Sequence, residues 1–105
     1  MTPEVGQVVT VFRSRLRPDA SAYAADAAAI ADLARTMPGY VEHKAFSAED
    51  GERVTLVTFA DRASHDAWRD HPEHRAAQRR GIDGYYTEYS ISVGVTDHAS
   101  AFPRA

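Results

Sequence analysis

The segment that decides the fold is "YVEHKAFSAEDGERVTLVTFA", residues 40–60. Its two ends, "YVEHKAFSA" and "RVTLVTFA", are rich in β-branched and aromatic residues, which favour extended strands. They are joined through Glu49-Asp50-Gly51-Glu52, in which the Asp-Gly pair is a strong signal for a tight hairpin. The segment therefore predicts two antiparallel strands that pair directly with each other.

A helical pattern precedes this hairpin. In residues 17–40, "RPDASAYAADAAAIADLARTMPGY", apolar side chains recur at spacings of three and four, which predicts an amphipathic helix. These positions are Tyr23, Ala27, Ile30, Ala34 and Met37. We expect Asp19 or Ser21 to cap the helix and Pro38-Gly39 to end it.

A second helical region follows the hairpin, and it is broken in two. Asp61 is expected to cap a short helix, which His71-Pro72 interrupts because the residue before a proline disfavours helical torsions. Proline suits the first turn of a new helix, so "PEHRAAQRR" predicts a further helix that ends at Gly81.

The first and last strands of the chain complete the pattern. They are predicted over "GQVVTVFRSRL", residues 6–16, and "GYYTEYSISVGV", residues 84–95. The order of elements is β-α-β-β-α-β, which is typical of an α+β, ferredoxin-like domain with one antiparallel sheet and its helices on one face. We expect a single domain over residues 1–95 and a tail without a clear element over residues 96–105.

The strands carry apolar residues on both faces. In the first strand, Val9 and Val11 alternate with Val8 and Phe12, and the third strand repeats this pattern. One layer of helices covers only one face, and monomers rarely expose a large apolar surface. A second copy packed sheet to sheet is the simplest cover, so the sequence predicts a homodimer.

Composition excludes several classes of function. A net charge of -3 gives no general attraction to nucleic acid or anionic lipid, and no run approaches the ~18 apolar residues of a membrane helix. The start "MTPEVGQ" lacks the features of a secretion signal. The absence of cysteine excludes thiolate metal sites and a cysteine nucleophile, and together these features favour a cytoplasmic location.

Three stretches carry a resemblance to a known family: "PGYVEHKAF", "DGERVTLVTF", and "AWRDHPEHRAAQRRG" followed by "YYTEY". In these the chain resembles the antibiotic biosynthesis monooxygenase family of the dimeric α/β-barrel superfamily. The resemblance implies that two sheets close into a barrel-like dimer, with a pocket between sheet and helices in each protomer. Family members include cofactor-free oxygenases of polyketide quinone precursors, haem-degrading enzymes and proteins of unknown role.

Three functional positions of the haem-degrading branch can be compared with this sequence. That branch has an asparagine on the first strand, a tryptophan on the second helical region and a histidine ligand ten residues later. Here Trp68 matches, but the ligand position falls on Gln78 and the asparagine position near Ser14. This counts against haem degradation by that route, although His74 or His71 could ligate iron from a neighbouring turn.

The candidate catalytic residues lie in "AWRDHPEHRAAQRRG". Trp68 is either a core residue or a flat wall for an aromatic ligand. His71 and His74 either cap the helix and bond a backbone group, or one of them is a general base, since imidazole titrates near neutral pH. The histidine spacing matches no zinc signature, and the neighbouring arginines alternate with acidic residues as on a salt-bridged surface.

Further residues are candidates for substrate binding. They are Trp68, Phe59, Ser14, His43, Gln78 and Tyr86. Alternation along the strand predicts that His43 faces away from Tyr40, and that Tyr85 and Tyr86 point in opposite directions, so that only one of that pair enters a given pocket. His65 and His98 are expected on the surface.

The resemblance, taken with these candidate residues, favours an oxygenase that uses no metal or organic cofactor and oxidises a phenolic, polyketide-like aromatic substrate to a quinone. The substrate anion would pass an electron to O₂, the radical pair would recombine at carbon, and water would leave. The protein must hold a flat ring, remove a proton and stabilise oxyanion charge. The alternatives are a haem-binding or haem-degrading monooxygenase and a non-catalytic dimer that binds a small ligand.

Overall fold

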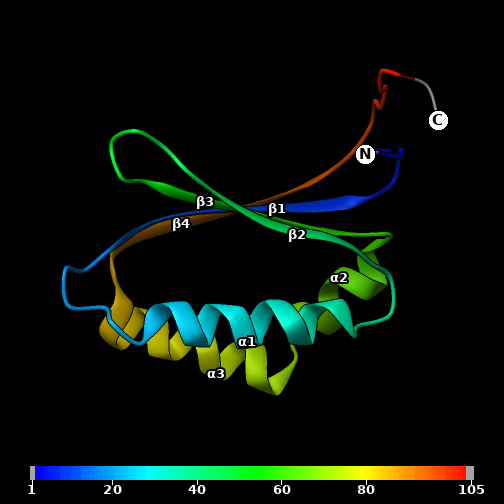
Figure 1. The fold of residues 1–105 in the computed structure, drawn as a ribbon. Coiled ribbons are helices and arrows are strands. Elements are labelled where there is room, and N and C mark those ends of the chain that lie inside the picture. Colours follow the sequence, from blue (N-terminus) through cyan, green and yellow to red (C-terminus); the bar gives the residue numbers. More distant parts are fainter. Residues whose placement is uncertain (1, 104–105) are drawn as a thin grey trace.

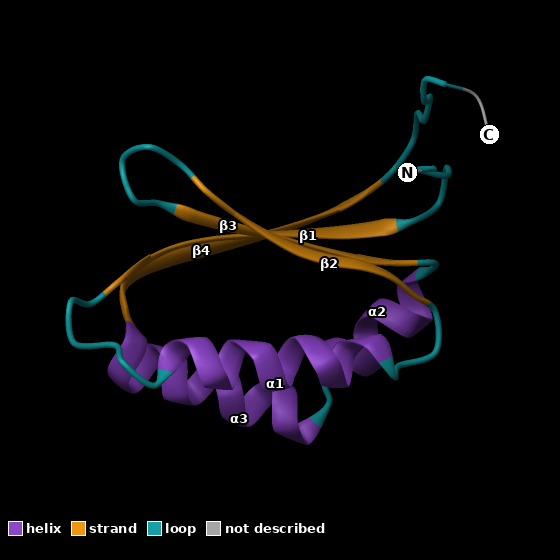
Figure 2. Cartoon of the chain, in the orientation of Figure 1, coloured by secondary structure: helices purple, strands orange, loops and turns teal. Residues whose placement is uncertain are grey.

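The computed structural model describes residues 2–103 and contains one open four-stranded antiparallel sheet, with its helices on one face (Figures 1 and 2). The elements are, in chain order, β1 (Val8–Leu16), α1 (Tyr23–Arg35), β2 (Tyr40–Ser47), β3 (Arg53–Phe59), α2 (Arg62–Arg69), α3 (Pro72–Arg80), a π-helical turn (Gly81–Tyr85) and β4 (Tyr86–Val95). This order confirms the predicted ferredoxin-like arrangement, including the broken second helical region.

The strand order β2-β3-β1-β4 places β1 at the centre of the sheet. Val8 of β1 lies opposite Phe59 of β3 on one side and Val95 of β4 on the other. The predicted hairpin between β2 and β3 is present, and Gly51 adopts a φ of 88°, a left-handed conformation that favours glycine.

The helix ends confirm two predicted caps and correct a third. The Asp61 side chain accepts a hydrogen bond from Ser64 N at 2.8 Å, and the His71 ring accepts one from Glu73 N at 3.1 Å. The prediction of Asp19 or Ser21 as the cap of α1 is wrong. The N-cap is Ala22, which makes no side-chain bond. Successive backbone turns lead into this helix, so carbonyl groups accept the bonds that a capping side chain would otherwise make.

The core lies between the sheet and the helices. Its buried apolar residues are Val8, Ala34, Val57, Phe59 and Trp68. Three of the predicted helix positions, Ile30, Ala34 and Met37, belong to this core or pack against it. The amphipathic pattern therefore placed α1 correctly over the sheet.

The opposite face of the sheet is covered by none of the described helices (Figure 1). Register and alternation put Val9 and Val11 of β1 on this face with Val54 and Leu56 of β3. The two partly apolar faces predicted from the sequence are thus present, and the second face is available for a partner. Within residues 2–103, no helix has the length and apolar character needed to cross a membrane.

Candidate functional site

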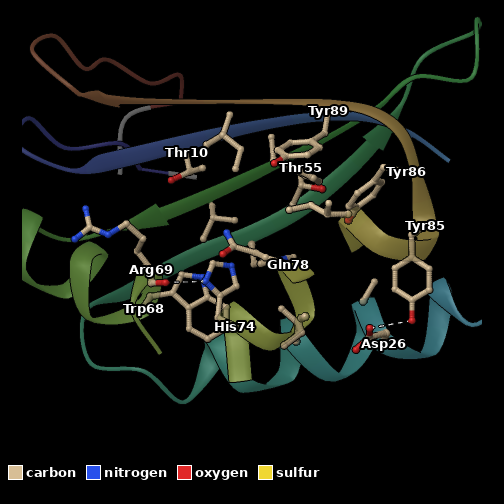
Figure 3. Close-up of a pocket in the computed structure, with 18 of the residues that line it drawn as sticks. Thr10, Asp26, Thr55, Trp68, Arg69, His74, Gln78, Tyr85, Tyr86 and Tyr89 are labelled. Atoms are coloured by element: carbon tan, nitrogen blue, oxygen red, sulfur yellow. Dashed lines mark hydrogen bonds between the residues drawn. The ribbon is translucent and has the colours of Figure 1, made fainter. Parts of the chain in front are cut away.

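A cavity of about 450 Å³ lies between the sheet and the helices (Figure 3). Residues from all four strands, the three helices and the π-turn contribute to its walls. Its volume falls in the range of small-molecule sites in proteins. One end is formed around Trp68 and His74, the other around Tyr85 and Tyr86, and Gln78 lies between them.

The first end contains a stacked tryptophan and histidine. The break between α2 and α3 brings the His74 ring onto Trp68, with ring centroids 4.4 Å apart and an interplanar angle of 22°. His74 Nδ1 lies 3.4 Å from the Arg69 carbonyl oxygen, a contact that favours hydrogen on Nδ1 and leaves Nε2 as an acceptor. Burial lowers the pKa of His74, so the imidazole is neutral at neutral pH.

His43 of β2 borders the same cavity. Its pKa is also lowered, mainly by burial and in smaller part by Arg35, and His43 in turn contributes to the lowered pKa of His74. The prediction that His43 and Tyr40 face opposite ways is wrong. A bulge between Tyr40 and Glu42 adds a residue to the strand, so both side chains lie on the helix-covered face.

The second end is rich in tyrosine. Tyr85 Oη donates to Asp26 Oδ2 at 3.0 Å, and Arg80 holds the same carboxylate through two bonds of 2.6 and 2.7 Å. This cluster joins α1 to the end of α3. Burial, with a smaller contribution from Tyr23, raises the pKa of Tyr86, so Tyr86 remains a phenol at neutral pH.

Tyr85 and Tyr86 both line the cavity, contrary to the expectation that only one would do so. Tyr85 ends the π-turn and Tyr86 begins β4, so strand alternation does not apply to the pair. The turn also depends on Gly81, because a Cβ at this position would overlap the Tyr86 ring. π-Helical turns are frequent at functional sites.

The cavity brings together five of the predicted site residues: Trp68, His74, His43, Gln78 and Tyr86. The other three lie outside its lining. Phe59 is buried behind Trp68, with ring centroids 6.4 Å apart. His71 serves as the cap of α3, and Ser14 borders a separate polar depression beside Arg13 and Glu52. Their placement removes the geometric basis for direct roles in this cavity.

His65 was missed by the sequence reasoning. It was expected on the surface, but it is only 5% exposed and lines the cavity. Its Nδ1 lies 2.8 Å from Asp66 Oδ1. The available signal was its spacing of three from Trp68, which puts both side chains on the inward face of α2.

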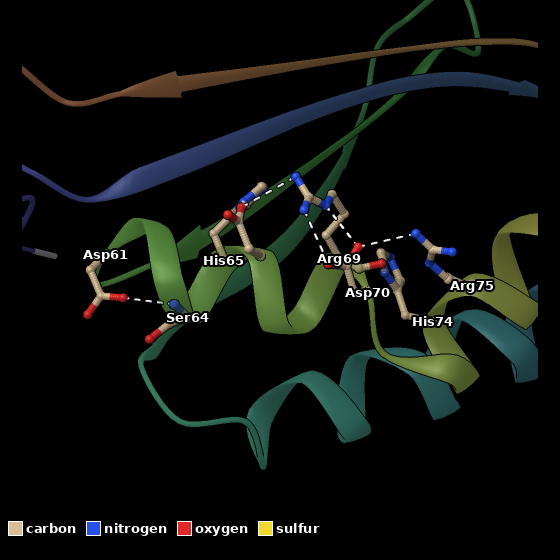
Figure 4. Close-up of polar contacts among 8 residues, drawn as sticks. Asp61, Ser64, His65, Arg69, Asp70, His74 and Arg75 are labelled. Atoms are coloured by element: carbon tan, nitrogen blue, oxygen red, sulfur yellow. Dashed lines mark hydrogen bonds and ion pairs between the residues drawn. The ribbon is translucent and has the colours of Figure 1, made fainter.

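The predicted salt bridges join charged side chains of α2 and α3 (Figure 4). Arg69 contacts Asp66 at 3.5 Å and Asp70 at 3.0 Å, and Arg75 also reaches Asp70, at 3.3 Å. No cluster of three His, Asp or Glu side chains arranged to hold a metal ion occurs in residues 2–103.

Residues 7–80 match the family model described as "Antibiotic biosynthesis monooxygenase". The chain belongs to this family. It is 27% identical over 101 residues to the uncharacterized protein YqjZ of Bacillus subtilis, a match that covers 96% of this chain and 89% of that protein.

Two solved structures illustrate the shared fold. Rv0793 from Mycobacterium tuberculosis has a TM-score of 0.78 and 24% identity, and the match covers 90% of this chain and 100% of that one. SnoaB from Streptomyces nogalater, a cofactor-independent oxygenase, has a TM-score of 0.77 and 14% identity, with 94% and 99% of the two chains covered. At these identities the likeness shows the fold alone.

Proposed function

We propose that this protein is a monooxygenase that oxidises a phenolic, polyketide-like aromatic molecule to a quinone with O₂ and without a metal or organic cofactor. The observation that carries the proposal is the stacked pair of Trp68 and His74 in a cavity of about 450 Å³. It combines a flat aromatic surface with a neutral imidazole whose Nδ1 is held by a backbone carbonyl. Membership of the family and the likeness in fold to a cofactor-independent oxygenase support it.

In this mechanism the substrate ring lies beside the stacked pair of Trp68 and His74, and His74 Nε2 accepts the first proton. The resulting anion gives one electron to O₂, and the two radicals combine to form a carbon–oxygen bond. Proton transfer from a phenol with a pKa near 10 to an imidazole near 6.5 costs about 5 kcal/mol, and the lowered pKa of His74 increases this cost. The site must therefore stabilise the phenolate.

Neutral donors from two sides of the cavity are placed to stabilise this charge. The Gln78 side chain enters from α3, and the Thr10 and Thr55 hydroxyl groups lie on the sheet wall opposite (Figure 3). Arg69 also borders the cavity, but its guanidinium is already paired with two carboxylates. We therefore assign the oxyanion role to the amide and hydroxyl groups.

The proposed assembly is a homodimer formed through the uncovered sheet face. Such packing would bury the apolar residues of β1 and β3 and leave the cavity on the other side of each sheet. The partner copy would then stabilise the sheet that carries the site.

Oxygen uptake with an anthrone or a naphthol tests the activity, with metal chelated and the absorption spectrum recorded beforehand. We expect uptake coupled to quinone formation, reduced at least about tenfold in the double variant Trp68→Phe, His74→Ala. His98→Gln, which changes an exposed histidine, is the matched control. Unchanged turnover in the double variant would remove Trp68 and His74 from the mechanism.

Haem binding is a second candidate, because His43, His65 and His74 all border the cavity. The family position of the iron ligand is occupied by Gln78, and a carboxamide is a poor ligand for haem iron. Titration with haemin separates the two candidates, and no Soret shift at micromolar protein would eliminate haem. A third candidate, a dimer that binds an aromatic ligand without turnover, predicts ligand binding without oxygen uptake.

A further inference from the structure

The buried histidine His65 is not used by the mechanism described above. It lies on the first half of α2 and faces the cavity on the same side of the helix as Trp68. Burial of a polar ring requires a reason, because an imidazole away from water loses hydration unless its nitrogen atoms find partners. The two ring nitrogens of His65 have different environments.

Nδ1 is held by a carboxylate. It lies 2.8 Å from Asp66 Oδ1, and the Asp66 carboxylate is itself contacted by Arg69 at 3.5 Å (Figure 4). A carboxylate beside Nδ1 favours the tautomer with hydrogen on that atom, so the lone pair is on Nε2.

Nε2 has no hydrogen-bond partner among residues 2–103. Among these residues, Arg53 Nε is the only side-chain nitrogen or oxygen that is fully buried without a hydrogen-bond partner, so Nε2 is not such an atom. The His65 side chain as a whole lines the cavity. The result is a buried imidazole that is oriented by a carboxylate and borders the proposed substrate site.

The proposed reaction requires two proton removals when the substrate carbon is a CH₂ group, as in an anthrone. His74 takes the first proton, O₂ adds to the carbanion, and His74 returns the proton to the peroxide anion to give a CH–OOH group. In the second stage the remaining C–H proton must leave, its electron pair forms the C=O bond, and the O–O bond breaks. The departing hydroxide takes a proton and leaves as water, so that CH₂ and O₂ become C=O and H₂O.

We propose that His65 is the base for this second stage, with Asp66 as its positioning residue. His65 Nε2 accepts the C–H proton of the hydroperoxide and passes it to the departing hydroxide, which returns the ring to its neutral form. This inference rests on the proposed function. It divides the two proton transfers between imidazoles on different helices that border one cavity, His65 on α2 and His74 on α3.

The test uses rapid mixing of the full-length protein with anthrone and O₂, followed by chemical quenching at successive times. A phosphine in the quench reduces any hydroperoxide to the alcohol, so that alcohol and quinone are measured separately by chromatography. The variants are His65→Gln, which removes the base, and Asp66→Asn, which removes its carboxylate partner. Asp66 is partly exposed, and its substitution also removes the charge that Arg69 contacts. His98→Gln is the control, and circular dichroism reports on folding.

We expect His65→Gln to consume O₂ and accumulate hydroperoxide, with quinone formation from it slowed roughly a hundredfold. Asp66→Asn should show the same accumulation with a smaller slowing of about tenfold. A purely structural role would lower oxygen uptake and quinone formation together, without accumulation. The inference is overturned if the folded variants lose oxygen uptake and quinone formation in the same proportion. It is also overturned if they form quinone at the rate of the unaltered protein. Absence of oxygen uptake by the unaltered protein would instead refute the proposed function, and this inference with it.

Discussion

If two copies of the chain associate through the uncovered face of the sheet, a charge placed on that face should weaken the dimer. Leu56 lies on β3, opposite Val11 of β1 and Lys44 of β2, near the middle of the face that no described helix covers. The change Leu56→Arg would put a second positive charge beside Lys44 in the expected interface. Without association the site is partly exposed, and an arginine there is tolerated with little effect on folding.

The magnitude follows from the burial of an unpaired charge. Removing one partner from a buried ion pair costs about 3–5 kcal/mol, and a new charge without a partner is penalised for the same reason. Because about 1.4 kcal/mol corresponds to a factor of ten, the dimer dissociation constant should rise by at least roughly 10²- to 10³-fold. The two-fold symmetry of the expected dimer places a copy of the substitution on each protomer, which increases the effect.

Sedimentation velocity over a range from nanomolar to high micromolar protein measures this shift. The matched control is Ala28→Arg, which adds the same charge at an exposed position of α1. We expect a dimer for the unaltered protein and for the control, and a largely monomeric Leu56 variant with unchanged circular dichroism. A stable monomer at high concentration in the unaltered protein, or equal association of the Leu56 variant, would refute the reasoning.

Two further predictions concern stability. Folding lowers the pKa of His43 and His74, so the unfolded chain binds protons first as pH falls. The free energy of unfolding should therefore decline from about pH 6.5 towards the lower pKa values of the folded state. Thermal melts at a series of pH values should show this decline, and replacing both histidines by glutamine should reduce the dependence of stability on pH. Gly81→Ala should lower the free energy of unfolding by about 1–3 kcal/mol, because its methyl group would overlap the Tyr86 ring. Gly84→Ala, in the same turn with open space around it, is the control in urea denaturation, and equal stability of the two variants would contradict this account.

The elements themselves were predictable because their signals are local. The Asp-Gly turn, the period of α1, and the Pro72 interruption each depend on a few neighbouring residues, and the structure confirms all three. The alternation in β1 and β3 likewise revealed the two apolar faces. The cap of α1 was not predictable in this way, since backbone carbonyls could replace the expected side chain.

The site was less predictable because small irregularities change which way a side chain points. One extra residue in β2 puts Tyr40 and His43 on one face, and the π-turn lets Tyr85 and Tyr86 enter the same cavity. His65 was expected on the surface because charged residues surround it in the sequence, although its spacing from Trp68 matches the inward face of α2.

Thus the sequence by itself determined the order of the elements, the packing of the helices on one face of the sheet, and the likeness to the family, because hydrophobic period and turn chemistry act over short distances. Only the tertiary structure decided which polar side chains share the cavity. Strands and helices far apart in the chain supply its walls, and a bulge, a helix break and a π-turn set the final direction of each ring.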